Sequence, residues 1–424
     1  MTPEIKHRIE QIRRGEVPEG YEKKRKVVIP QQWRLPQIKD IASISSGSTP
    51  RRNNSEYWNG NIAWVTTGEL SSGHVNHTSE LITVKAVKEA KMRIYPQGTL
   101  LMAMYGQGKT RGTVAILEID AAVNQACAAI TVKDGKSKFL FYQLKNSYQD
   151  IRKLSNTGNQ ENLNADIIKT YQVPWAPDEE QERISTILTT QDKVIELKEK
   201  RLAEKQRQKK YLMQQLLTGK KRLPGFSGEW KNIKLCEVLP ERKEKNVEQN
   251  LRICSVAVQK GVVDQVEHLG RSYAANDTSN YSVAHYGDII YTKSPTGDFL
   301  YGIVKQNLLQ ETVAVSPLYG VFTPLTFGLG YFLHTYFQSA ICARNYLLPI
   351  VQKGAKNTIN ITNDTFISSK LYLPLDVEEQ KAIADTFIAA DREIDLLRQD
   401  IEQEKQKKKA LMQLLLTGIV RVKT

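Results

Sequence analysis

Two short stretches of this 424-residue chain have residue types that carry out chemistry in other proteins. In Gly108-Lys109-Thr110, a lysine and a hydroxyl follow a glycine, as they do at the end of a phosphate-binding loop. That loop also requires a glycine at position 103, where this chain has Ala103, and the preceding run lacks the glycine-rich loop. The stretch therefore does not predict a nucleotide-binding site.

The second stretch matches a loose nuclease pattern of paired acids and a lysine, with Pro177-Asp178 followed by Glu196-Leu197-Lys198. In a nuclease site the acids converge on a metal ion from a sheet. Here the second part falls on a predicted long helix, with Lys198 on its packing seam, so we interpret the match as accidental. The chain also has no Asn-Pro-Pro-Tyr or Asp-Pro-Pro-Tyr stretch, which an adenine methyltransferase centre would need.

Metal and redox chemistry find no support either. The cysteines are far apart and form no Cys-x-x-Cys pair, which argues against a zinc site and fits a reducing cytoplasm; they are Cys127, Cys236, Cys254 and Cys342. Of the six histidines, only His74 and His77 are close together, and their Gly/Ser-flanked turn predicts that both are exposed. No apolar run is long enough to span a membrane. We expect a soluble cytoplasmic protein with no catalytic residue, no metal and no cofactor of its own.

The charge of the chain points to a binding function instead. There are 60 Lys and Arg against 46 Asp and Glu, a formal net charge of +14. Such an excess predicts a polyanionic partner, most commonly nucleic acid, although it can also serve solubility alone. Lys and Arg would then bind phosphates, while a few polar side chains read base edges in the major groove.

The candidate DNA-binding residues cluster on predicted turns in both halves of the chain. In the first half they are Ser46, Thr49, Arg51, Arg52, Asn53, Tyr57, Trp58, Thr66, Thr67, Tyr105, Gln107, Lys109, Thr110, Arg111, Asn159 and Gln160. In the second half they are Gln259, Lys260, Tyr291, Lys293, Ser294, Thr296, Lys353, Lys356 and Asn357. The tryptophans Trp33, Trp64 and Trp230 are expected in the core instead.

A repeated stretch predicts the scaffold that positions these residues. Residues 179–222 and 378–421 align without a gap at an offset of 199 (378 − 179), and 17 of the 44 aligned positions are identical. Steps of four and three residues from Ile184 and from Ile383 mark heptad seams that are apolar at both ends and polar in the middle. We expect two helices of roughly 60 Å each, paired as an antiparallel coiled coil. The alternative is a surface helix that packs only on its own domain.

The repeat extends over each half of the chain. A basic linker and a tryptophan precede each variable body, because Lys23-Lys24-Arg25 and Trp33 match Lys220-Lys221-Arg222 and Trp230 at an offset of 197 (230 − 33). The two bodies have nearly equal lengths but barely agree in sequence. Two bodies of equal length and different sequence, each between similar flanking segments, suggest one scaffold that carries two different recognition modules. The expected segments are an N-terminal helix and basic linker at 1–32, a first body at 33–178, a helix at 179–222, a second body at 223–376 and a helix at 377–424.

Within the bodies, short β-rich runs alternate with turns and predict α+β globules. The expected strands cover residues 61–65, 98–104, 113–117, 128–132, 253–258, 288–291 and 312–315. The expected helices cover residues 3–14, with Thr2 as the cap, and 138–153 and 330–342.

Several motifs resemble those of type I restriction–modification specificity subunits. The junction Leu223-Pro224-Gly225-Phe226-Ser227-Gly228-Glu229-Trp230 is similar to the family's central conserved region, and each Glu-Glu-Gln helix start follows a proline, as in the family. Ser46-Gly47-Ser48-Thr49-Pro50, Val123-Asn124-Gln125 and Thr157-Gly158-Asn159-Gln160-Glu161-Asn162-Leu163 resemble patterns of its target recognition domains. The resemblance covers essentially the whole chain. The second body lacks clear equivalents of the first two of these three patterns.

The resemblance implies two target recognition domains, related by a pseudo-two-fold axis, that are spaced by the coiled coil. Each would read one half of a bipartite, asymmetric site on double-stranded DNA, with half-sites about one helical turn, roughly 34–36 Å, apart. The chain itself would be non-catalytic. It would bind two modification subunits, which bring S-adenosylmethionine and adenine methylation, and through them the restriction subunits, which use ATP and magnesium. The alternatives are a restriction–modification-like nuclease with catalysis in this chain, and a protein-only coiled-coil adaptor.

Overall fold

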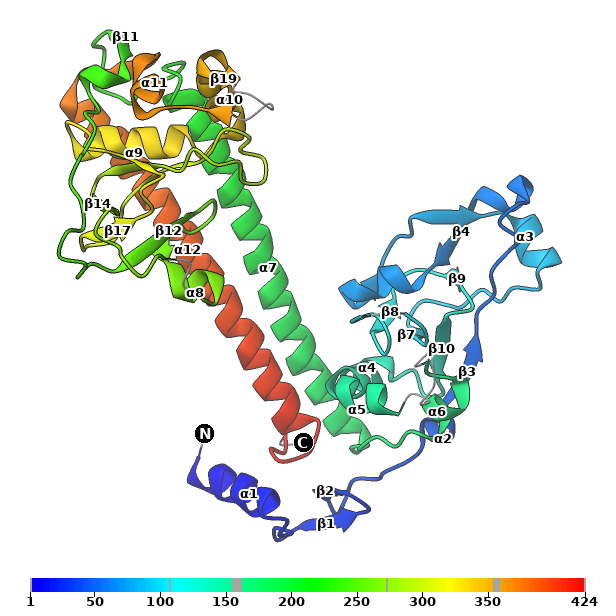
Figure 1. Ribbon diagram of the computed structural model, residues 1–424. Coiled ribbons are helices and arrows are strands. Elements are labelled where there is room, and N and C mark those ends of the chain that lie inside the picture. The colour runs from blue at the N-terminus through cyan, green and yellow to red at the C-terminus, as the bar shows by residue number, and fades with distance from the viewer. Residues whose placement is uncertain (1, 107, 155–161, 272–273, 354–358, 423–424) are drawn as a thin grey trace. The chain divides into compact units, whose positions relative to one another are not determined.

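The computed structural model describes residues 2–106, 108–154, 162–271, 274–353 and 359–422 (Figure 1). The chain forms two compact units, of which unit 1 comprises Met1–Lys198 with Asp400–Thr424 and unit 2 comprises Glu199–Gln399. Two long helices, α7 (Asp178–Leu216) and α12 (Val377–Leu415), are each continuous and contribute one part to each unit. The two helices predicted from the repeat are therefore present, and each unit contains a stretch of both.

Within each unit the two helices pack against one another in antiparallel fashion, as the heptad seams predict. Ion pairs join them, and the partner positions on α12 fall as those on α7 rise. In order along α7, the pairs are Asp192 with Lys408, Lys198 with Asp400, Lys205 with Glu393 and Lys209 with Asp391. At the apolar ends of the seams, Ile184, Leu188, Ile383 and Phe387 are all at most 1% exposed. A helix that packs only on its own domain would not have these partners.

An N-terminal arm completes unit 1 by covering the end of α12. The arm consists of α1 (Pro3–Arg13), β1 (Tyr21–Lys24) and β2 (Val27–Pro30). The Tyr21 hydroxyl donates to the carbonyl of Gly418 at 2.7 Å, and Arg8 Nη1 donates to that of Ile419 at 2.6 Å. These donors attach the arm to Gly418 and Ile419, which follow the end of α12 at Leu415.

The body of unit 1 is built on two sheets, in the orders β3-β10-β7-β8-β5 and β6-β4-β9. Its elements are α2 (Ile38–Ile41), β3 (Ala42–Ser46), η1 (Ser55–Tyr57), β4 (Trp58–Val65), η2 (Thr67–Ser72), β5 (His74–Val75), β6 (Glu80–Ile82), α3 (Val84–Glu89), β7 (Leu100–Ala103), β8 (Val114–Leu117), β9 (Ala121–Val123), β10 (Cys127–Val132), α4 (Ser137–Asn146), α5 (Tyr148–Lys153) and α6 (Ala165–Thr170). One core joins the first sheet, α4 and the ends of both long helices, and Trp33 is 1% exposed within it.

The body of unit 2 also contains two main sheets, in the orders β13-β12-β17-β14 and β16-β15-β18, and a pair β11-β21. Its elements are β11 (Trp230–Lys234), η3 (Leu235–Glu237), β12 (Ile253–Ala257), β13 (Gly261–Asp264), α8 (Gln265–Leu269), β14 (Ser282–Ala284), β15 (Ile289–Tyr291), β16 (Val304–Gln306), β17 (Val313–Val315), β18 (Gly320–Phe322), α9 (Phe327–Tyr336), α10 (Ala340–Leu347), η4 (Leu348–Ile350), β19 (Gln352–Lys353), β20 (Ile359–Asn360), α11 (Asn363–Ser368) and β21 (Lys370–Pro374). Trp230, Ile383 and Phe387 share its largest core.

The two bodies repeat one strand topology that their sequences do not reveal. In unit 1, β7 pairs antiparallel with β8 and β10, and β9 pairs parallel with β4. In unit 2, β15 pairs antiparallel with β16 and β18, and β17 pairs parallel with β12. Matching the registers of β7 and β15 aligns Ala103 with Tyr291, and Cys127 with Gly320. The repeat inferred from the linkers and helices therefore includes the bodies.

The expected strands are confirmed, but two expected helices are each interrupted. The helix expected at residues 138–153 is α4 followed by α5, with a break at Ser147. The helix expected at 330–342 is replaced by α9 and α10. The Ser339 side chain accepts a hydrogen bond from the backbone N–H of Cys342 and so starts α10 as a separate helix.

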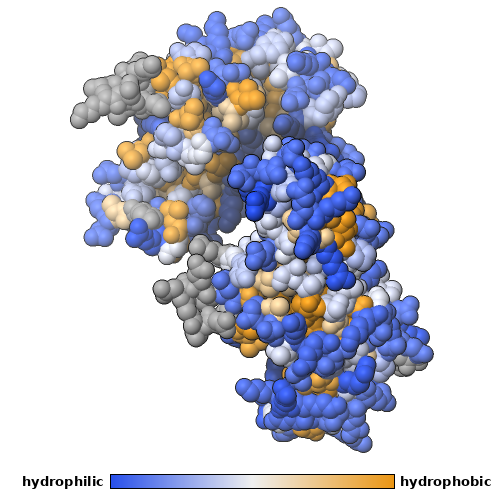
Figure 2. Space-filling view, turned by 90° about the vertical axis from the view of Figure 1, so that its right-hand side faces the viewer, coloured by the Kyte–Doolittle hydropathy of each residue, from blue (hydrophilic) through white to orange (hydrophobic). Residues whose placement is uncertain are grey.

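The surface agrees with the charged composition of the chain. On the face shown in Figure 2, hydrophilic residues cover most of the molecule and hydrophobic residues form scattered patches. None of the helices in the described ranges has the length and apolar character needed to cross a membrane.

Candidate nucleic-acid interface

Two of the sequence motifs in unit 1 meet at one end of the strands of its larger sheet. We call this end of the strands the edge of the unit. β3 and β7 both end beside the start of β10, the strand that lies between them. The backbone N–H of Gly47 donates to the carbonyl of Cys127 at 3.3 Å, and that of Ser48 donates to Val123 at 2.9 Å. The Ser-Gly-x-Thr-Pro motif and the Asn-Gln motif are therefore adjacent in space.

The approach of these two segments requires glycine at position 47. A Cβ atom there would lie 2.1 Å from the carbonyl oxygen of Val123 and 2.4 Å from that of Asn124. Neither backbone oxygen can move away without breaking the contact that joins the motifs. The close packing of the two segments therefore explains the glycine of this motif, independently of any role of the neighbouring hydroxyl groups.

Leu163, the last residue of the third motif, and the end of β4 reach the same edge. The N–H of Met104 donates to the carbonyl of Ala126 at 2.8 Å, and the N–H of Leu163 donates to that of Met104 at 2.9 Å. The N–H of Asn124 donates to Val65, the last residue of β4, at 2.9 Å. The strand ends thus gather Ser46, Thr49, Thr66, Thr67 and Tyr105, five of the predicted DNA-binding residues.

This edge includes an unsatisfied polar atom. The side-chain oxygen of Asn124 is buried and has no hydrogen-bond partner among the described residues. A buried acceptor without a partner is unfavourable by about 1–3 kcal/mol.

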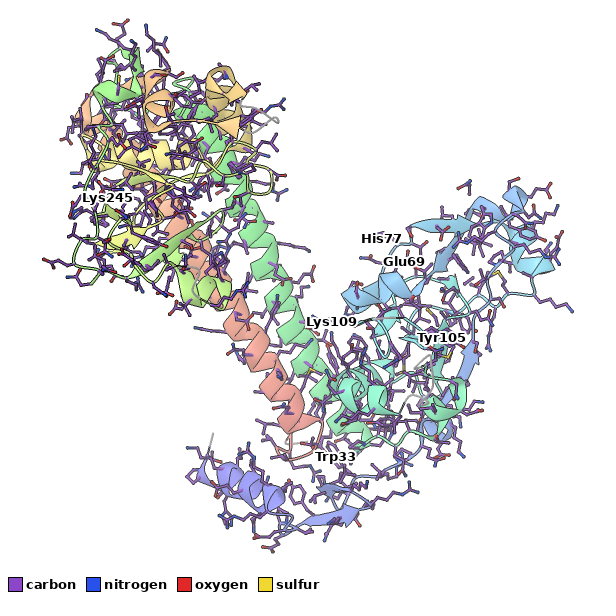
Figure 3. All side chains as sticks on the ribbon, viewed as in Figure 1. Trp33, Glu69, His77, Tyr105, Lys109 and Lys245 are labelled. Atoms are coloured by element: carbon purple, nitrogen blue, oxygen red, sulfur yellow. The ribbon has the colours of Figure 1, made fainter. Side chains whose placement is uncertain are left out.

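The loop after β7 is held by α5 and presents its tip to solvent. The Tyr148 hydroxyl donates to the carbonyl of Lys109 at 2.6 Å, and Arg152 Nη1 donates to that of Arg111 at 2.9 Å. Tyr105 is 39% exposed at the start of this loop. Figure 3 labels Tyr105 and Lys109 in this part of unit 1. The loop is followed by β8 and not by a helix, which agrees with the absence of a phosphate-binding loop there.

Arg52 is engaged within unit 1. Its guanidinium carbon lies 4.3 Å from the ring centroid of Trp58 and 5.0 Å from that of Trp64, and its Nη2 donates to Glu80 Oε2 at 3.0 Å. The Arg52 hydrogen bond lowers the pKa of the Glu80 carboxyl. Arg52 remains a predicted DNA-binding residue, and its contacts in unit 1 order the segment that contains its exposed neighbour Arg51.

Other predicted residues also have structural partners. Tyr57 is 9% exposed, and its hydroxyl donates to Glu89 Oε2 at 2.6 Å. Tyr291 is fully buried, donates to the carbonyl of Tyr301 at 2.6 Å and stacks on Phe366 at 4.4 Å between centroids. The side chains of these two tyrosines belong to the cores and do not face solvent.

The remaining predicted residues are distributed as follows. Arg111 is 7% exposed and Thr110 is half-buried. Asn53 is exposed, Gln259 and Lys260 are exposed on the turn between β12 and β13, and Ser294 and Thr296 are exposed on the loop between β15 and β16. Lys353 ends β19. Gln107, Asn159, Gln160, Lys356 and Asn357 lie outside the described residues.

The same edge exists in unit 2, although the sequence motifs are missing there. Glu241 pairs opposite Phe322, so the chain continues past the Gly320 end of β18, as Ser46 and Thr49 continue past Cys127 in unit 1. By this register Lys245 corresponds to Thr49. Sequence comparison missed Lys245 because only the strand pairing establishes the correspondence. Figure 3 labels it in unit 2.

Buried carboxylates attach each body to the start of a long helix. Glu180, 0% exposed, accepts from Trp33 Nε1 at 2.9 Å and from two nitrogens of Arg421 at 2.8 Å each. In unit 2, Glu379 is 1% exposed and accepts from Trp230 Nε1 at 3.0 Å and from Arg222. The second glutamate of each Glu-Glu-Gln repeat is thus the residue that fixes the body on the scaffold.

The residues of the nuclease pattern do not converge. Asp178 and Glu196 lie on one helix, about 27 Å apart at 1.5 Å per residue. Lys198 binds Asp400 at 2.7 Å and Glu404 at 2.9 Å across the helix pair. In the described part of the chain, no group of three or more His, Cys, Asp or Glu side chains is arranged to hold a metal ion. His74 and His77 are exposed, as expected.

Comparison with known proteins identifies one domain family twice along the chain. Residues 30–206 and 228–406 each match the model of the type I restriction modification DNA specificity domain. The MjaIX specificity subunit of Methanocaldococcus jannaschii is 34% identical over 178 residues, which cover 41% of this chain and 40% of that protein. The MjaVIII specificity subunit of the same organism is 24% identical over 429 residues, covering 93% and 94%.

Solved structures agree on the fold. A type I restriction–modification S subunit from M. genitalium superposes with a TM-score of 0.57 at 11% identity, covering 93% of this chain and 98% of that one. A chain from a study of type I R-M complex assembly and conformational transition gives a TM-score of 0.54 at 15% identity, covering 92% and 99%. At these identities the likeness concerns the fold alone.

Proposed function

Since this chain belongs to the type I restriction–modification specificity subunit family, we propose that it reads a bipartite, asymmetric DNA site, one half-site with each body. The observation that carries the proposal is the pair of topologically equivalent edges, one in each unit, on which exposed polar and basic side chains gather. Two bodies of one fold with different edge residues would recognise two different half-sites. Because it would bind DNA, we expect the protein in the cytoplasm.

Catalysis would be supplied by partner subunits. The chain would bind two modification subunits, which carry S-adenosylmethionine, and through them restriction subunits that use ATP and magnesium. We assign no cofactor or metal to this chain. The separation of Asp178 from Glu196 along one helix, and the engagement of Lys198 in the helix pair, support a non-catalytic role.

Exchange of one body tests the two-module proposal. Residues 33–176 would be replaced by the first body of another family member, and methylated sites in host DNA would be mapped with the partner subunits present. We expect one half of the target sequence to change and the other half to stay as in the unmodified protein. A change in both halves would contradict the assignment of one half-site to each body.

Cleavage by the isolated chain tests the nuclease alternative. Purified protein would be incubated with DNA, magnesium and ATP, with no other subunit. We expect intact DNA, together with binding that weakens steeply as salt rises because phosphate contacts release counterions. Cleavage without added subunits would overturn the non-catalytic assignment, and salt-independent or absent binding would favour a protein-only adaptor.

A further inference from the structure

Two lysines of unit 2 extend past the same end of β18. On one side of that strand, Lys245 follows Glu241, which pairs opposite Phe322. On the other side, Lys293 follows the end of β15, where Tyr291 pairs with Gly320. Both segments therefore leave the sheet at the edge that in unit 1 gathers the recognition motifs.

Local contacts hold both lysines in place. The backbone of Lys245 bridges to Ser282, and its Nζ donates to the Ser282 hydroxyl at 3.1 Å. Lys293 has a φ of 59°, a left-handed conformation that side-chain-bearing residues seldom adopt. A Cβ at Gly302 would lie 2.8 Å from the backbone nitrogen of Lys293, so the opposite arm of the loop packs directly against it. The two side chains are positioned by their surroundings and not by an acidic partner.

The carboxylates near these lysines are engaged elsewhere. Glu244 Oε2 lies 2.7 Å from His285 Nε2 and accepts from Arg242 Nη1 at 3.3 Å. Asp288 accepts from two nitrogens of Arg242, and Glu241 accepts from the side-chain amide of Asn363. Within the described ranges, neither Lys245 nor Lys293 has a carboxylate within ion-pair distance. The only acid of the loop between β15 and β16 is Asp298, which is exposed at its turn.

The charged form of the Lys293 side chain is destabilised at this edge. Burial is the largest cause and lowers the pKa of its ammonium group; the charge of Glu241 partly opposes it, and the charge of Lys245, a smaller effect, lowers the pKa again. The two like charges act on one another, and a bound anion would attract both. The arrangement thus favours a ligand with concentrated negative charge.

We propose that Lys245 and Lys293 together bind a backbone phosphate of duplex DNA beside the half-site of the second body. The assignment rests on the proposed function, since it places a contact at the edge that would read DNA. A lysine binds phosphate as a point charge and does not distinguish bases, so this contact sets position and affinity, not sequence. The equivalent positions in unit 1 are Thr49 and Tyr105, both neutral, so the first body lacks this phosphate contact.

The test measures how DNA affinity depends on salt in the full-length chain. Binding of a 30-base-pair duplex of random sequence would be titrated from low to physiological salt for the wild type, Lys245→Gln, Lys293→Gln and the double variant. We expect the double variant to decrease the steepness of the negative slope of log affinity against log salt by about 1, the value for one lost phosphate contact. Each single variant should give a smaller decrease, and Lys245→Arg should keep the wild-type slope.

The control is Lys231→Gln, which removes an exposed lysine on β11 and should leave the slope unchanged. If the double variant has the same slope as Lys231→Gln, the assignment is overturned. Glutamine keeps most of the lysine stem, and unfolding midpoints report whether each variant is folded. If Lys293→Gln unfolds, Lys245→Gln at an exposed position still decides the outcome. A wild type without salt-dependent binding would instead refute the proposed function.

Discussion

At the scale of single residues, the strongest constraints lie where buried charge fixes a body on its helix. Glu180 and Glu379 are almost completely buried, and each is neutralised by an arginine from the segment that follows a long helix. In unit 1 that arginine is Arg421, close to the C-terminal end of the described chain. Removing one partner of a buried pair leaves an uncompensated charge, which is far more unfavourable than losing a surface pair.

We therefore expect Glu180→Gln to destabilise unit 1 by about 2–4 kcal/mol, at the lower part of the range for buried pairs because Arg421 is 35% exposed. Hydrogen exchange, followed separately in each unit, would measure the change. Glu379→Gln should have the corresponding effect in unit 2. Exposed Glu179→Gln is the matched control, and equal loss of protection in both variants would contradict a specific role for the buried glutamate.

At the scale of elements, the polar middle of the helix pair specifies how the two helices align. Gln191 Nε2 donates to Glu404 Oε2 at 2.6 Å, and Lys198 donates to Glu404 and to Asp400 across the seam. Polar groups at seam positions restrict the register, because a shifted pairing would leave them without partners. The polar middle of the heptad seams is thus a specific set of contacts between the two helices.

This network predicts a response to acid. The hydrogen bond from Lys198, with that from Gln191, lowers the pKa of Glu404 to about 2, below its ordinary value of 4.5. A depressed folded-state pKa adds stability that is fully present above pH 4.5 and is lost as pH falls toward 2. We expect the unfolding midpoint to fall over this window, and Glu404→Gln to flatten that part of the profile. Exposed Glu402→Gln should retain the wild-type profile; a profile unchanged by Glu404→Gln would contradict the assignment.

At the scale of the whole molecule, the two long helices are the only described elements that contribute residues to both units. Their length should therefore set the distance between the two half-sites in the target. This inference follows from continuity of the helices along the chain, together with the proposed assignment of one half-site to each body.

Inserting one heptad into each helix, after Lys198 and after Gln399, keeps the seam and adds about 10 Å. We expect the unspecified spacer of the target to lengthen by about three base pairs, at 3.4 Å per base pair, while both half-site sequences remain. Mapping of methylated sites would measure the spacer. Insertion into α7 alone should disrupt pairing, and an unchanged spacer in the double insertion would refute the role of the helices as a ruler.

The sequence determined the architecture because its strongest signals are local or periodic. The repeat, the heptad seams and the tryptophan cores are confirmed, since helix pairing follows from spacing along one chain. The sequence did not predict the break between α4 and α5 at Ser147, because a serine alone is not a strong signal for the end of a helix. The proposed DNA-binding residues remain predictions, although the structure shows which of them, such as Tyr291, belong to a core.

Only the tertiary structure decided how the equivalent edges of the two bodies are assembled. Segments around Gly47, Val123 and Leu163 are far apart in sequence and meet through strand pairing, which no local pattern encodes. The equivalence of Lys245 with Thr49 likewise depends on register, because the two bodies conserve backbone pairing while their side chains differ. Hydrophobic periodicity specifies helices and strands, but which strand ends become neighbours is determined by the packing of the complete sheet.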